Sequence, residues 1–484
     1  MLPVACSSDD GGTPTTDSGV DTGADTGPLD PLAVPCTDTK DAVYGAPGTL
    51  PADKGAILKC SPADTIAKAA LQAKVDGIGY KGKALTSGYR SYRILYRTER
   101  GTKTPSAGYT SAMVFLPDTP RAAKLPVVLF GRGSRGQAAK CAPSRLEPEG
   151  AYVQGDYDAA VLPLVGAGYA VIAPDLSGYA NFGAADNPVA AYGNANDSGK
   201  ALLDGSRALR KLVPTILSDK VVLVGHSQGG HVALSGAALS GTYGVDGTLA
   251  GVALYAPLWL AQRTWGALLL LADAYPIATE PTPNAVSIWY HYTTSELLDG
   301  PGRGGDVFRA DKRAAIKAFV ESDCWAKNYP KLEALGTKAT DLFDPAFDAA
   351  VTNAAAAGSA CPTADPAKTL CETWMARYKA DRPSLSALKA PVLFMYGAKD
   401  TTIPPQRVTC AIDTMEKDGV KPTYCVDPDQ DHGGIVRAKS SYVADWIGSV
   451  TLGETAPAAC AKGKEAILAT DGKPATCDPI PPND

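Results

Sequence analysis

The sequence predicts an α/β fold with a mostly parallel central sheet and an inserted helical cap, or lid. Short segments that are apolar throughout alternate with helix-like segments, which is typical of parallel strands buried on both faces. This alternation stops between Pro257 and Pro391, where the sequence is rich in Ala and helix-like. The chain has 484 residues, more than one typical domain, so we expect a large domain that carries an additional piece.

The expected strands and helices follow one another in a regular order. Two early strands are predicted at residues 91–96 and 111–116. Buried strands are then predicted at residues 126–130, 169–173, 221–224, 249–255 and 391–396. Residues 200–212 predict an amphipathic helix with its leucines on one face, and residues 231–239 predict a second helix.

These segments divide the chain into four parts. Residues 1–35 are rich in Asp, Gly and Thr and contain no basic residue, so we expect a flexible tether there. Residues 36–257 are expected to form the first part of the core, and residues 258–388 the helical cap. Residues 389–484 are expected to form the second part of the core and a C-terminal extension.

Charge and composition exclude several classes of protein. The net charge is −5, and this mild acidity argues against nucleic acid as a partner. No uninterrupted apolar run reaches about 18 residues, so we predict no transmembrane helix. Four histidines and the absence of a Cys-x-x-Cys pair give no support for a metal centre or a redox site. We therefore expect no metal and no cofactor.

The cysteines predict a location outside the cytoplasm. Ten of the eleven are widely spread and suit up to five disulfides in an oxidising compartment. The other is Cys6, which follows Val4 and Ala5 and precedes the Asp-rich tether. This resembles the start of a mature bacterial lipoprotein, in which the cysteine carries the lipid.

The resemblance at Cys6 has two departures. Pro3 stands where such motifs usually hold Leu, and the basic and apolar parts of a signal peptide are missing. We interpret this as a truncated start and expect lipid on Cys6. The protein would then be secreted or lipid-anchored to a bacterial membrane, with that lipid as its sole membrane contact. An ordinary secreted tail with one extra cysteine is the alternative.

The chemistry begins at Ser227. The motif Gly225-x-Ser227-x-Gly229 follows an apolar strand and precedes a helix of small residues, as in a nucleophile elbow. This turn exposes the serine hydroxyl, and the flanking glycines let strand and helix approach closely. Because of this context we interpret Ser227 as a nucleophile rather than as part of a Gly-rich turn.

The base follows by elimination among the four histidines. Elbow enzymes have the chain order nucleophile, acid, histidine. His226 lies beside the nucleophile and His231 one turn into the next helix, so we expect packing roles for both. His291 falls in the inserted region. His432, in an Asp-His-Gly-Gly segment near the end of the core, fits the order, and its alternative is a surface-loop histidine.

Asp400 is the predicted acid. It ends the segment Gly-Ala-Lys-Asp directly after the strand at residues 391–396, where it can orient His432 and stabilise the imidazolium. The competing carboxylates are Asp427, Asp429 and Asp431. They lie close to the histidine in sequence, and we expect them in its own loop.

Acyl transfer also requires donors for a developing oxyanion. We expect the backbone N–H of Gln228, directly after the nucleophile, to be one donor. The second is expected from Ser134, in the Gly-rich loop at residues 131–136. That loop matches neither the dinucleotide-binding nor the P-loop pattern, so a phosphate-binding role is disfavoured.

These blocks together resemble the secretory lipases of the α/β-hydrolase superfamily, in the lipase-A-like group that has bacterial members. The resemblance runs from about Ala46 to Cys460. The matching blocks are residues 94–98, 132–136, 141–144, 168–175, 225–230, 397–400 and 431–434, followed by Trp446. Arg132 stands where the family usually has His, and Arg135 adds a second positive charge. The resemblance implies an α/β-hydrolase fold with a lid, and hydrolysis of carboxylic esters.

The start of the cap is its most apolar part. A lid needs an apolar underside, so we expect Trp259, Trp265, Leu269 and Leu270 to contact the acyl chain. The alternative is that such residues form the cap's own core. We therefore expect a monomeric serine ester hydrolase that forms an acyl-enzyme with small-molecule or lipid esters carrying apolar or medium-chain acyl groups.

Two other functions stay open at this point. A serine peptidase of the same fold would need a site for a peptide N-terminus, and no acidic cluster is assigned to one. A non-catalytic, surface-binding lipoprotein would have lost a triad member, whereas Ser227, Asp400 and His432 are all present.

Overall fold

The computed structural model of the chain describes residues 32–145, 155–180, 187–274, 277, 281–325, 329–469 and 471–477. Cys6 and residues 1–31 of the expected tether lie outside these described residues. Lipidation at Cys6 and flexibility of the tether therefore stay predictions.

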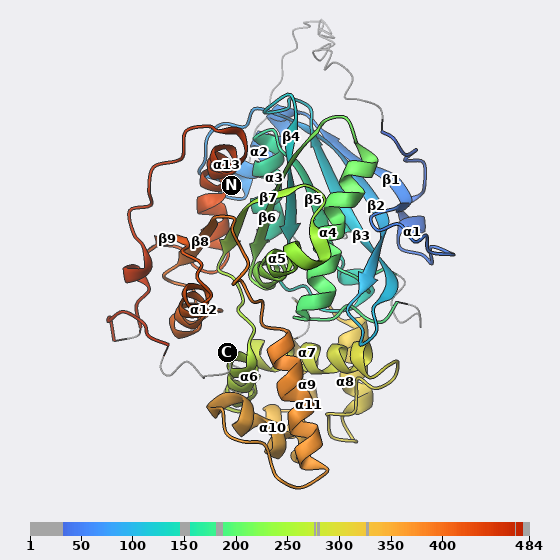
Figure 1. Cartoon of the computed structure of the whole chain (residues 1–484), viewed down its shortest axis with the longest axis vertical. Coiled ribbons are helices and arrows are strands. Elements are labelled where there is room, and N and C mark those ends of the chain that lie inside the picture. The colour runs from blue at the N-terminus through green and yellow to red at the C-terminus, as the bar shows by residue number, and fades with distance from the viewer. Residues whose placement is uncertain are drawn as a thin grey trace, which may run out of the picture.

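A nine-stranded sheet forms the centre of the molecule, in the order β1-β2-β3-β5-β4-β6-β7-β8-β9 (Figure 1). The strands are β1 (Ile57–Ile66), β2 (Tyr89–Arg100), β3 (Ser106–Pro117), β4 (Leu125–Gly131), β5 (Ala170–Pro174), β6 (Leu217–His226), β7 (Thr248–Tyr255), β8 (Val392–Gly397) and β9 (Thr423–Asp427). The first three ladders, from β1 to β5, are antiparallel, and the remaining five are parallel. The largely parallel α/β sheet that the sequence predicts is confirmed.

The two edge strands, β1 and β9, are absent from the prediction. Strand β1 carries polar and partly exposed residues along most of its length, and β9 has two buried residues in five. Neither forms a continuous apolar run, because an edge strand is not covered as a central strand is. Strands β2 and β3 were predicted, but each extends well beyond the expected six residues.

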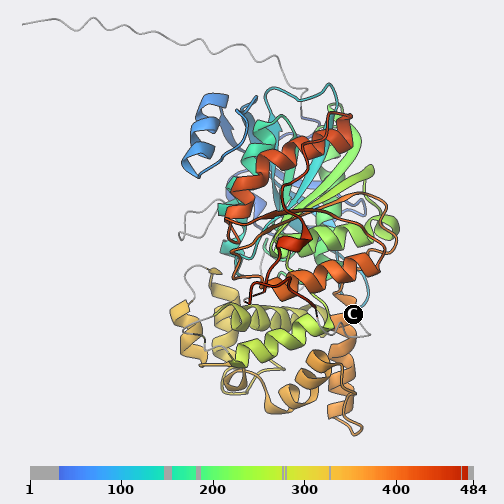
Figure 2. The ribbon, with the colours of Figure 1, turned by 90° about the vertical axis from the view of Figure 1, so that its left-hand side faces the viewer.

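Helices cover both faces of the sheet (Figures 1 and 2). On one face, α4 (Ala195–Leu212) packs against β2, β4 and β5, and α5 (Gln228–Leu239) packs against β4, β6 and β7. On the other face, α3 (Gly155–Gly166) and α13 (Gly434–Leu452) pack together over β3, β5 and β6 to β8. The shorter α2 (Lys68–Gly77) packs against α3, and α12 (Pro405–Lys417) connects β8 to β9.

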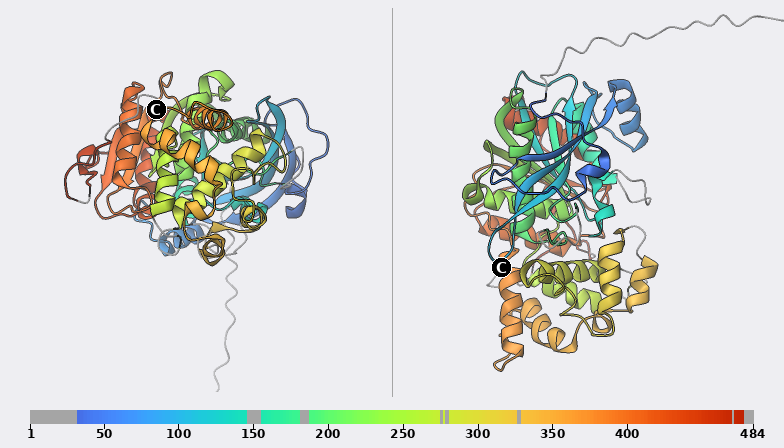
Figure 3. Two further views of the ribbon diagram at one scale, coloured as in Figure 1. Left: turned by 90° about the horizontal axis from the view of Figure 1, so that it is seen from below. Right: turned by 90° about the vertical axis from the view of Figure 1, so that its right-hand side faces the viewer.

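The cap lies between β7 and β8 in the chain and at one end of the sheet in space (Figures 1 to 3). Its helices are α6 (Gln262–Ala274), α7 (Thr282–Leu298), α8 (Arg313–Ser322), α9 (Tyr329–Leu335), α10 (Pro345–Ala357) and α11 (Ala367–Ala380). It has a hydrophobic cluster of its own, separate from the cluster around the sheet. Aromatic rings dominate this cluster, and Trp265 stacks on Tyr290 with ring centroids 3.5 Å apart.

Five disulfides join ten of the eleven cysteines, as the sequence predicts. The pairs are Cys36–Cys60, Cys141–Cys324, Cys361–Cys371, Cys410–Cys477 and Cys425–Cys460. One of them, Cys141–Cys324, ties the loop after β4 to the cap. This number of disulfides is consistent with an extracellular protein. Among the described residues, no helix is long and apolar enough to cross a membrane.

Candidate active site

Ser227 occupies a strained turn between β6 and α5. Its backbone has φ 53° and ψ −121°, a left-handed conformation that a non-glycine residue rarely adopts. Hydrogen bonds hold the turn on both sides: the Ser227 N–H donates to Tyr255 O at 3.0 Å, and the Leu258 N–H donates to Ser227 O at 2.8 Å. Strain of this kind that the surroundings maintain is typical of functional sites.

The glycines of the motif are required by close backbone contacts. A Cβ atom on Gly225 would lie 2.0 Å from the carbonyl oxygen of Gly229. A Cβ atom on Gly229 would lie 1.9 Å from the carbonyl oxygen of Gly131, at the end of β4. Glycine at these positions therefore lets the elbow, the first turn of α5 and the loop after β4 meet at one point.

His432 and Asp400 meet although they follow different strands. His432 Nδ1 lies 2.7 Å from Asp400 Oδ2, and the aspartate is buried. The other carboxylate oxygen, Oδ1, accepts the backbone N–H groups of Thr402 at 2.8 Å and Ile403 at 2.9 Å. A carboxylate at Nδ1 keeps the proton on that nitrogen, so Nε2 is the basic nitrogen of the ring.

The competing aspartates have other partners. The carboxylate of Asp427 pairs with Lys439 at 2.9 Å, and Asp429 pairs with Lys399 at 3.2 Å. Asp431 Oδ1 accepts the N–H of Gly434 at 2.6 Å, at the start of α13. The geometry thus favours Asp400 as the partner of His432.

The other histidines are buried in hydrogen-bonded positions. His231 Nε2 lies 2.8 Å from Asp381 O, and burial lowers its pKa to about 4. His291 lies in the cap core between Ser287 O and the Tyr378 hydroxyl, and burial lowers its pKa to about 3. Both rings are therefore neutral near pH 7. A neutral, buried ring agrees with the packing role expected for His231.

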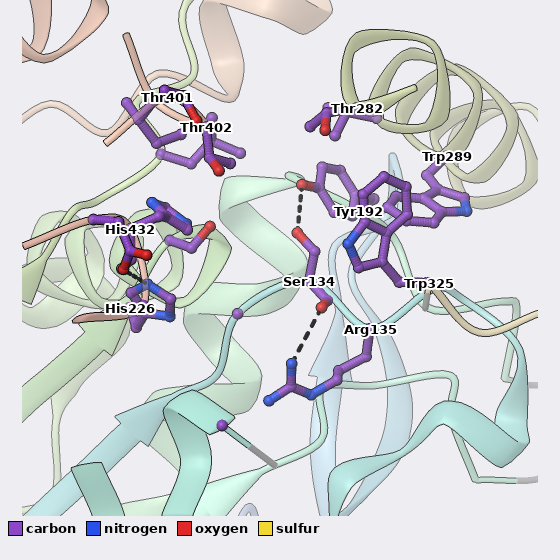
Figure 4. Close-up of a pocket in the computed structure, with 18 of the residues that line it drawn as sticks. Ser134, Arg135, Tyr192, His226, Thr282, Trp289, Trp325, Thr401, Thr402 and His432 are labelled. Atoms are coloured by element: carbon purple, nitrogen blue, oxygen red, sulfur yellow. Dashed lines mark hydrogen bonds between the residues drawn. The ribbon is translucent and has the colours of Figure 1, made fainter. Parts of the chain in front are cut away.

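His226 has a contact that the sequence did not suggest. Its Nε2 donates to the carbonyl oxygen of His432 at 3.0 Å, and the two ring centroids are 4.6 Å apart. Figure 4 shows the two rings side by side. His226 therefore helps to hold the loop that carries His432, in addition to packing beside the nucleophile.

A cavity of about 440 Å³ lies between the ends of the strands and the cap. Ser227, His432 and Ser134 all line it, and Figure 4 shows Ser134 facing Tyr192 across from His432. The hydroxyls of Ser134 and Tyr192 are 2.8 Å apart. The charged side chains on the described part of its lining are those of Arg135, Arg437 and Asp431.

The two predicted oxyanion donors come from adjacent segments. Gln228 is the first residue of α5, and the N–H groups of a first helical turn have no acceptor within the helix. Ser134 lies on the wall of the same cavity as Ser227, in the loop after β4. The positive end of the α5 dipole also lies at this point, which favours a negative charge there.

The cap residues chosen from the sequence need correction. Trp259 lines an adjoining cavity of about 230 Å³, which shares Leu258 and Leu268 with the larger one. By contrast, Trp265 and Leu269 are buried in the cap's own core, and the Leu270 side chain is 48% exposed. The physical reason is the helical period: residues four apart share a face.

On α6, one face points to the cavities and the next to the cap core. Thr264 and Leu268 line the smaller cavity, whereas Trp265 and Leu269 belong to the core of the cap. A run of consecutive leucines gives no sign of which residue points where. Among the α6 leucines whose side chains are described, Leu268 is thus the one that a substrate can reach from the cavities.

Comparisons with known proteins place this geometry in a family. Residues 150–420, more than half of the chain, match the alpha/beta hydrolase family. The chain belongs to the alpha/beta hydrolase family. A search of curated protein sequences gives no match.

Several solved structures share the fold of this hydrolase. A ligand-bound form of the rice cell wall degrading esterase LipA from Xanthomonas oryzae has a TM-score of 0.61 at 18% identity, over 83% of this chain and 100% of that one. Candida antarctica lipase A in its closed state has a TM-score of 0.59 at 17% identity, over 93% of this chain and 92% of that one. A structure described as that of a hydrolase from Legionella pneumophila has a TM-score of 0.59 at 17% identity, over 81% of this chain and 98% of that one. At these identities the likeness establishes the fold alone.

Proposed function

We propose that this alpha/beta hydrolase is a serine carboxylic-ester hydrolase, a lipase or esterase of the secretory lipase-A-like group. The supporting observation is that Ser227, on its strained elbow, shares a cavity with His432, whose Nδ1 lies 2.7 Å from the buried Asp400. A nucleophile, a base and a group that orients the base are the components of acyl transfer through a covalent intermediate.

The reaction would proceed through an acyl-enzyme. Ser227 Oγ attacks the ester carbonyl carbon while His432 Nε2 accepts its proton, and the Nδ1–H stays bonded to Asp400. The N–H groups of Gln228 and Ser134 stabilise the oxyanion of the tetrahedral intermediate. His432 then gives its proton to the leaving alcohol. In the second half, His432 activates a water molecule that releases the acid.

The substrate is proposed to be an ester with an apolar acyl group of medium length. The smaller cavity is lined by Leu258, Trp259, Leu268 and Ile403, and three of these, Leu258, Leu268 and Ile403, also line the larger cavity that holds Ser227. Each methylene group buried there would contribute up to about 0.8 kcal/mol. Four additional methylenes would then favour a medium chain over acetate by up to about 3 kcal/mol.

A peptidase of the same fold is less well supported. An aminopeptidase would need carboxylates to bind the ammonium group of the peptide. Among the described residues, the cavity lining holds one carboxylate, that of Asp431, together with the guanidinium groups of Arg135 and Arg437. Hydrolysis of p-nitroanilides of amino acids, measured beside that of esters, distinguishes the two activities. We also propose an extracytoplasmic protein of bacterial origin that is either secreted or lipid-anchored through Cys6. Mass spectrometry of the Cys6 peptide from protein expressed in a bacterium would show whether this cysteine carries a lipid.

The decisive experiment combines a substrate panel with the variant Ser227→Ala. The parent is expected to hydrolyse p-nitrophenyl esters between acetate and palmitate and to prefer medium chains. A fluorophosphonate should label Ser227, as identified by peptide mass spectrometry. Ser227→Ala should lose at least about 10³-fold in kcat with an unchanged melting temperature, because Ala is nearly as large as Ser. Activity within tenfold of the parent would refute the assignment.

A further inference from the structure

Arg132 is buried, with 1% of its side chain exposed, in the loop after β4. Burying a guanidinium group is unfavourable unless its N–H groups find acceptors. Its Nη1 donates to Gly133 O at 2.9 Å and to Gln228 Oε1 at 3.3 Å, and its Nη2 donates to Asp175 O at 3.0 Å. The guanidinium also lies over the ring of Tyr179, 4.7 Å from its centroid.

These acceptors are neutral oxygens rather than a carboxylate. The carboxylate of Asp175 is nearby, but it accepts the N–H of Ser144 at 2.8 Å, the Ser111 hydroxyl at 2.6 Å and the Ser144 hydroxyl. Within the described part of the chain, the hydrogen bonds of Arg132 go to two carbonyl oxygens and one amide oxygen and to no carboxylate. The contacts connect three segments: the loop after β4, the first residue of α5 and the end of β5.

Peptide geometry gives these contacts a consequence for the site. The carbonyl of Gly133 and the N–H of Ser134 belong to one planar trans peptide group, so they point in opposite directions. Because Gly133 O faces the buried guanidinium, the Ser134 N–H points away from it. Gly133 and Ser134 both line the cavity of Ser227. The same guanidinium holds the side chain of Gln228, whose own N–H is the other expected donor.

We propose that Arg132 is a positioning residue that aligns both oxyanion donors, Ser134 and Gln228, from the side opposite the substrate. This proposal rests on the proposed acyl transfer at Ser227. Arg132 touches no reacting atom, and its effect is exerted through the peptide group that it fixes. The oxyanion is absent from the bound substrate and develops on the way to the tetrahedral intermediate. Loss of the Arg132 side chain should therefore lower kcat and leave KM nearly unchanged.

The test compares Arg132→Met with Arg100→Met. Arg100 is an equally buried arginine, bonded to Asp197 and Asn187 and absent from the cavity lining. Arg132→Met is expected to lower kcat about 10²-fold, with KM within about threefold of the parent. Arg100→Met should lower the melting temperature at least as much while keeping kcat per fluorophosphonate-titrated site. The milder pair Arg132→Lys and Arg100→Lys serves where a methionine variant does not fold.

A transition-state analogue supplies a readout that a merely structural role would not change. A trifluoromethyl ketone forms a tetrahedral adduct whose oxyanion needs the two donors. Its inhibition constant should rise about 10²-fold in Arg132→Met, in step with the loss of kcat/KM, whereas Arg100→Met should leave it unchanged.

The two proposals fail in different ways. If Arg132→Met keeps kcat and ketone affinity within threefold of the parent, or loses them only in proportion to unfolded protein, the positioning role is wrong. If the parent itself hydrolyses no ester, or Ser227→Ala keeps activity, the proposed function is wrong instead.

Discussion

The sheet domain and the cap hold their site residues by different physical means. In the sheet domain, Ser227, Asp400 and His432 follow three parallel strands, β6, β8 and β9, and hydrogen bonds fix each one. In the cap, the residues that line the cavities come from α6, from α7 and from neighbouring segments, and the cap's own hydrophobic core supports them. Changes in the sheet domain should therefore alter the reaction rate, and changes in the cap should alter which ester enters.

The largest effect is expected for Asp400→Asn. The Oδ1 atom of Asp400 accepts two backbone N–H groups, so an asparagine oxygen would keep that place and its NH₂ group would face His432 Nδ1. The proton of the ring would then move to Nε2, the nitrogen that must accept the serine proton. We expect kcat to fall about 10³–10⁴-fold with an unchanged ratio of octanoate to acetate hydrolysis.

The control for that variant is Asp431→Asn. This substitution removes a carboxylate that is next to His432 in sequence. That carboxylate accepts the N–H of Gly434 and does not bond to the histidine ring. We expect steady-state kcat within about tenfold of the parent. If Asp431→Asn were the more damaging of the two, the assignment of the acid would have to change.

The disulfide between the two regions should have the next largest effect. Cys141–Cys324 closes a segment of 183 residues, whereas Cys361–Cys371 closes 10 within the cap. The double replacement Cys141→Ser, Cys324→Ser should lower the free energy of unfolding by about 2–4 kcal/mol. The corresponding pair in the cap should cost less, because a shorter loop restricts the unfolded chain less. Urea denaturation without reductant measures both, and equal losses would contradict the argument.

The same contrast explains what the sequence could reveal about the proposed catalytic residues. Ser227 was predictable because its elbow is built from local features: an apolar strand, close-packed glycines and a following helix. Asp400 and His432 were predictable because chain order in this type of fold restricts where they can lie. The two side chains meet at 2.7 Å in the structure, as expected for an acid and a base chosen by this order.

Other features depend on packing between distant segments and left no local signal. His226 and His432 are 206 residues apart, and the contact of Arg132 with Gln228 spans 96. Which side of α6 faces the cavities was not predictable either, because leucine occupies every position from 268 to 271. The edge strands β1 and β9 were not predicted because their partly exposed residues form no apolar run.

Acid should weaken the cap through His291. Burial lowers the pKa of this histidine from 6.5 to about 3 in the folded protein, so between these values the unfolded chain binds a proton that the folded one does not. Stability contributed by the neutral ring is therefore lost as pH falls below 6.5. The loss is about 2 kcal/mol between pH 6.5 and pH 5. His291→Gln should show a shallower pH dependence of the free energy of unfolding, measured in urea over that range.

The contribution of Asp381, at the cap boundary, to the free energy of unfolding changes with pH in the opposite direction. Burial raises the pKa of its carboxyl to about 7, and this carboxyl accepts the Tyr290 hydroxyl of the cap and the N–H of Ala195. The folded state therefore retains a proton that the unfolded state loses above its ordinary value of 3.8, and stability falls as pH rises towards 7. Asp381→Asn should remove this fall without changing the slope due to His291. Parallel shifts in both variants would show that the two groups are coupled.

The smallest expected effect is the most specific test of the cap. Leu268, Leu269 and Leu270 are consecutive in α6 but lie on the cavity wall, in the cap core and on the surface, respectively. Leu268→Asp should lower the ratio of octanoate to acetate kcat/KM about tenfold, because a charged group replaces apolar contact with the chain. Leu269→Asp should instead lower the melting temperature, with a smaller change in that ratio for the folded fraction. Leu270→Asp should change neither quantity. If Leu268→Asp slows acetate and octanoate equally, the acyl chain does not contact α6. The smaller cavity would then have to accommodate the alcohol part of the ester.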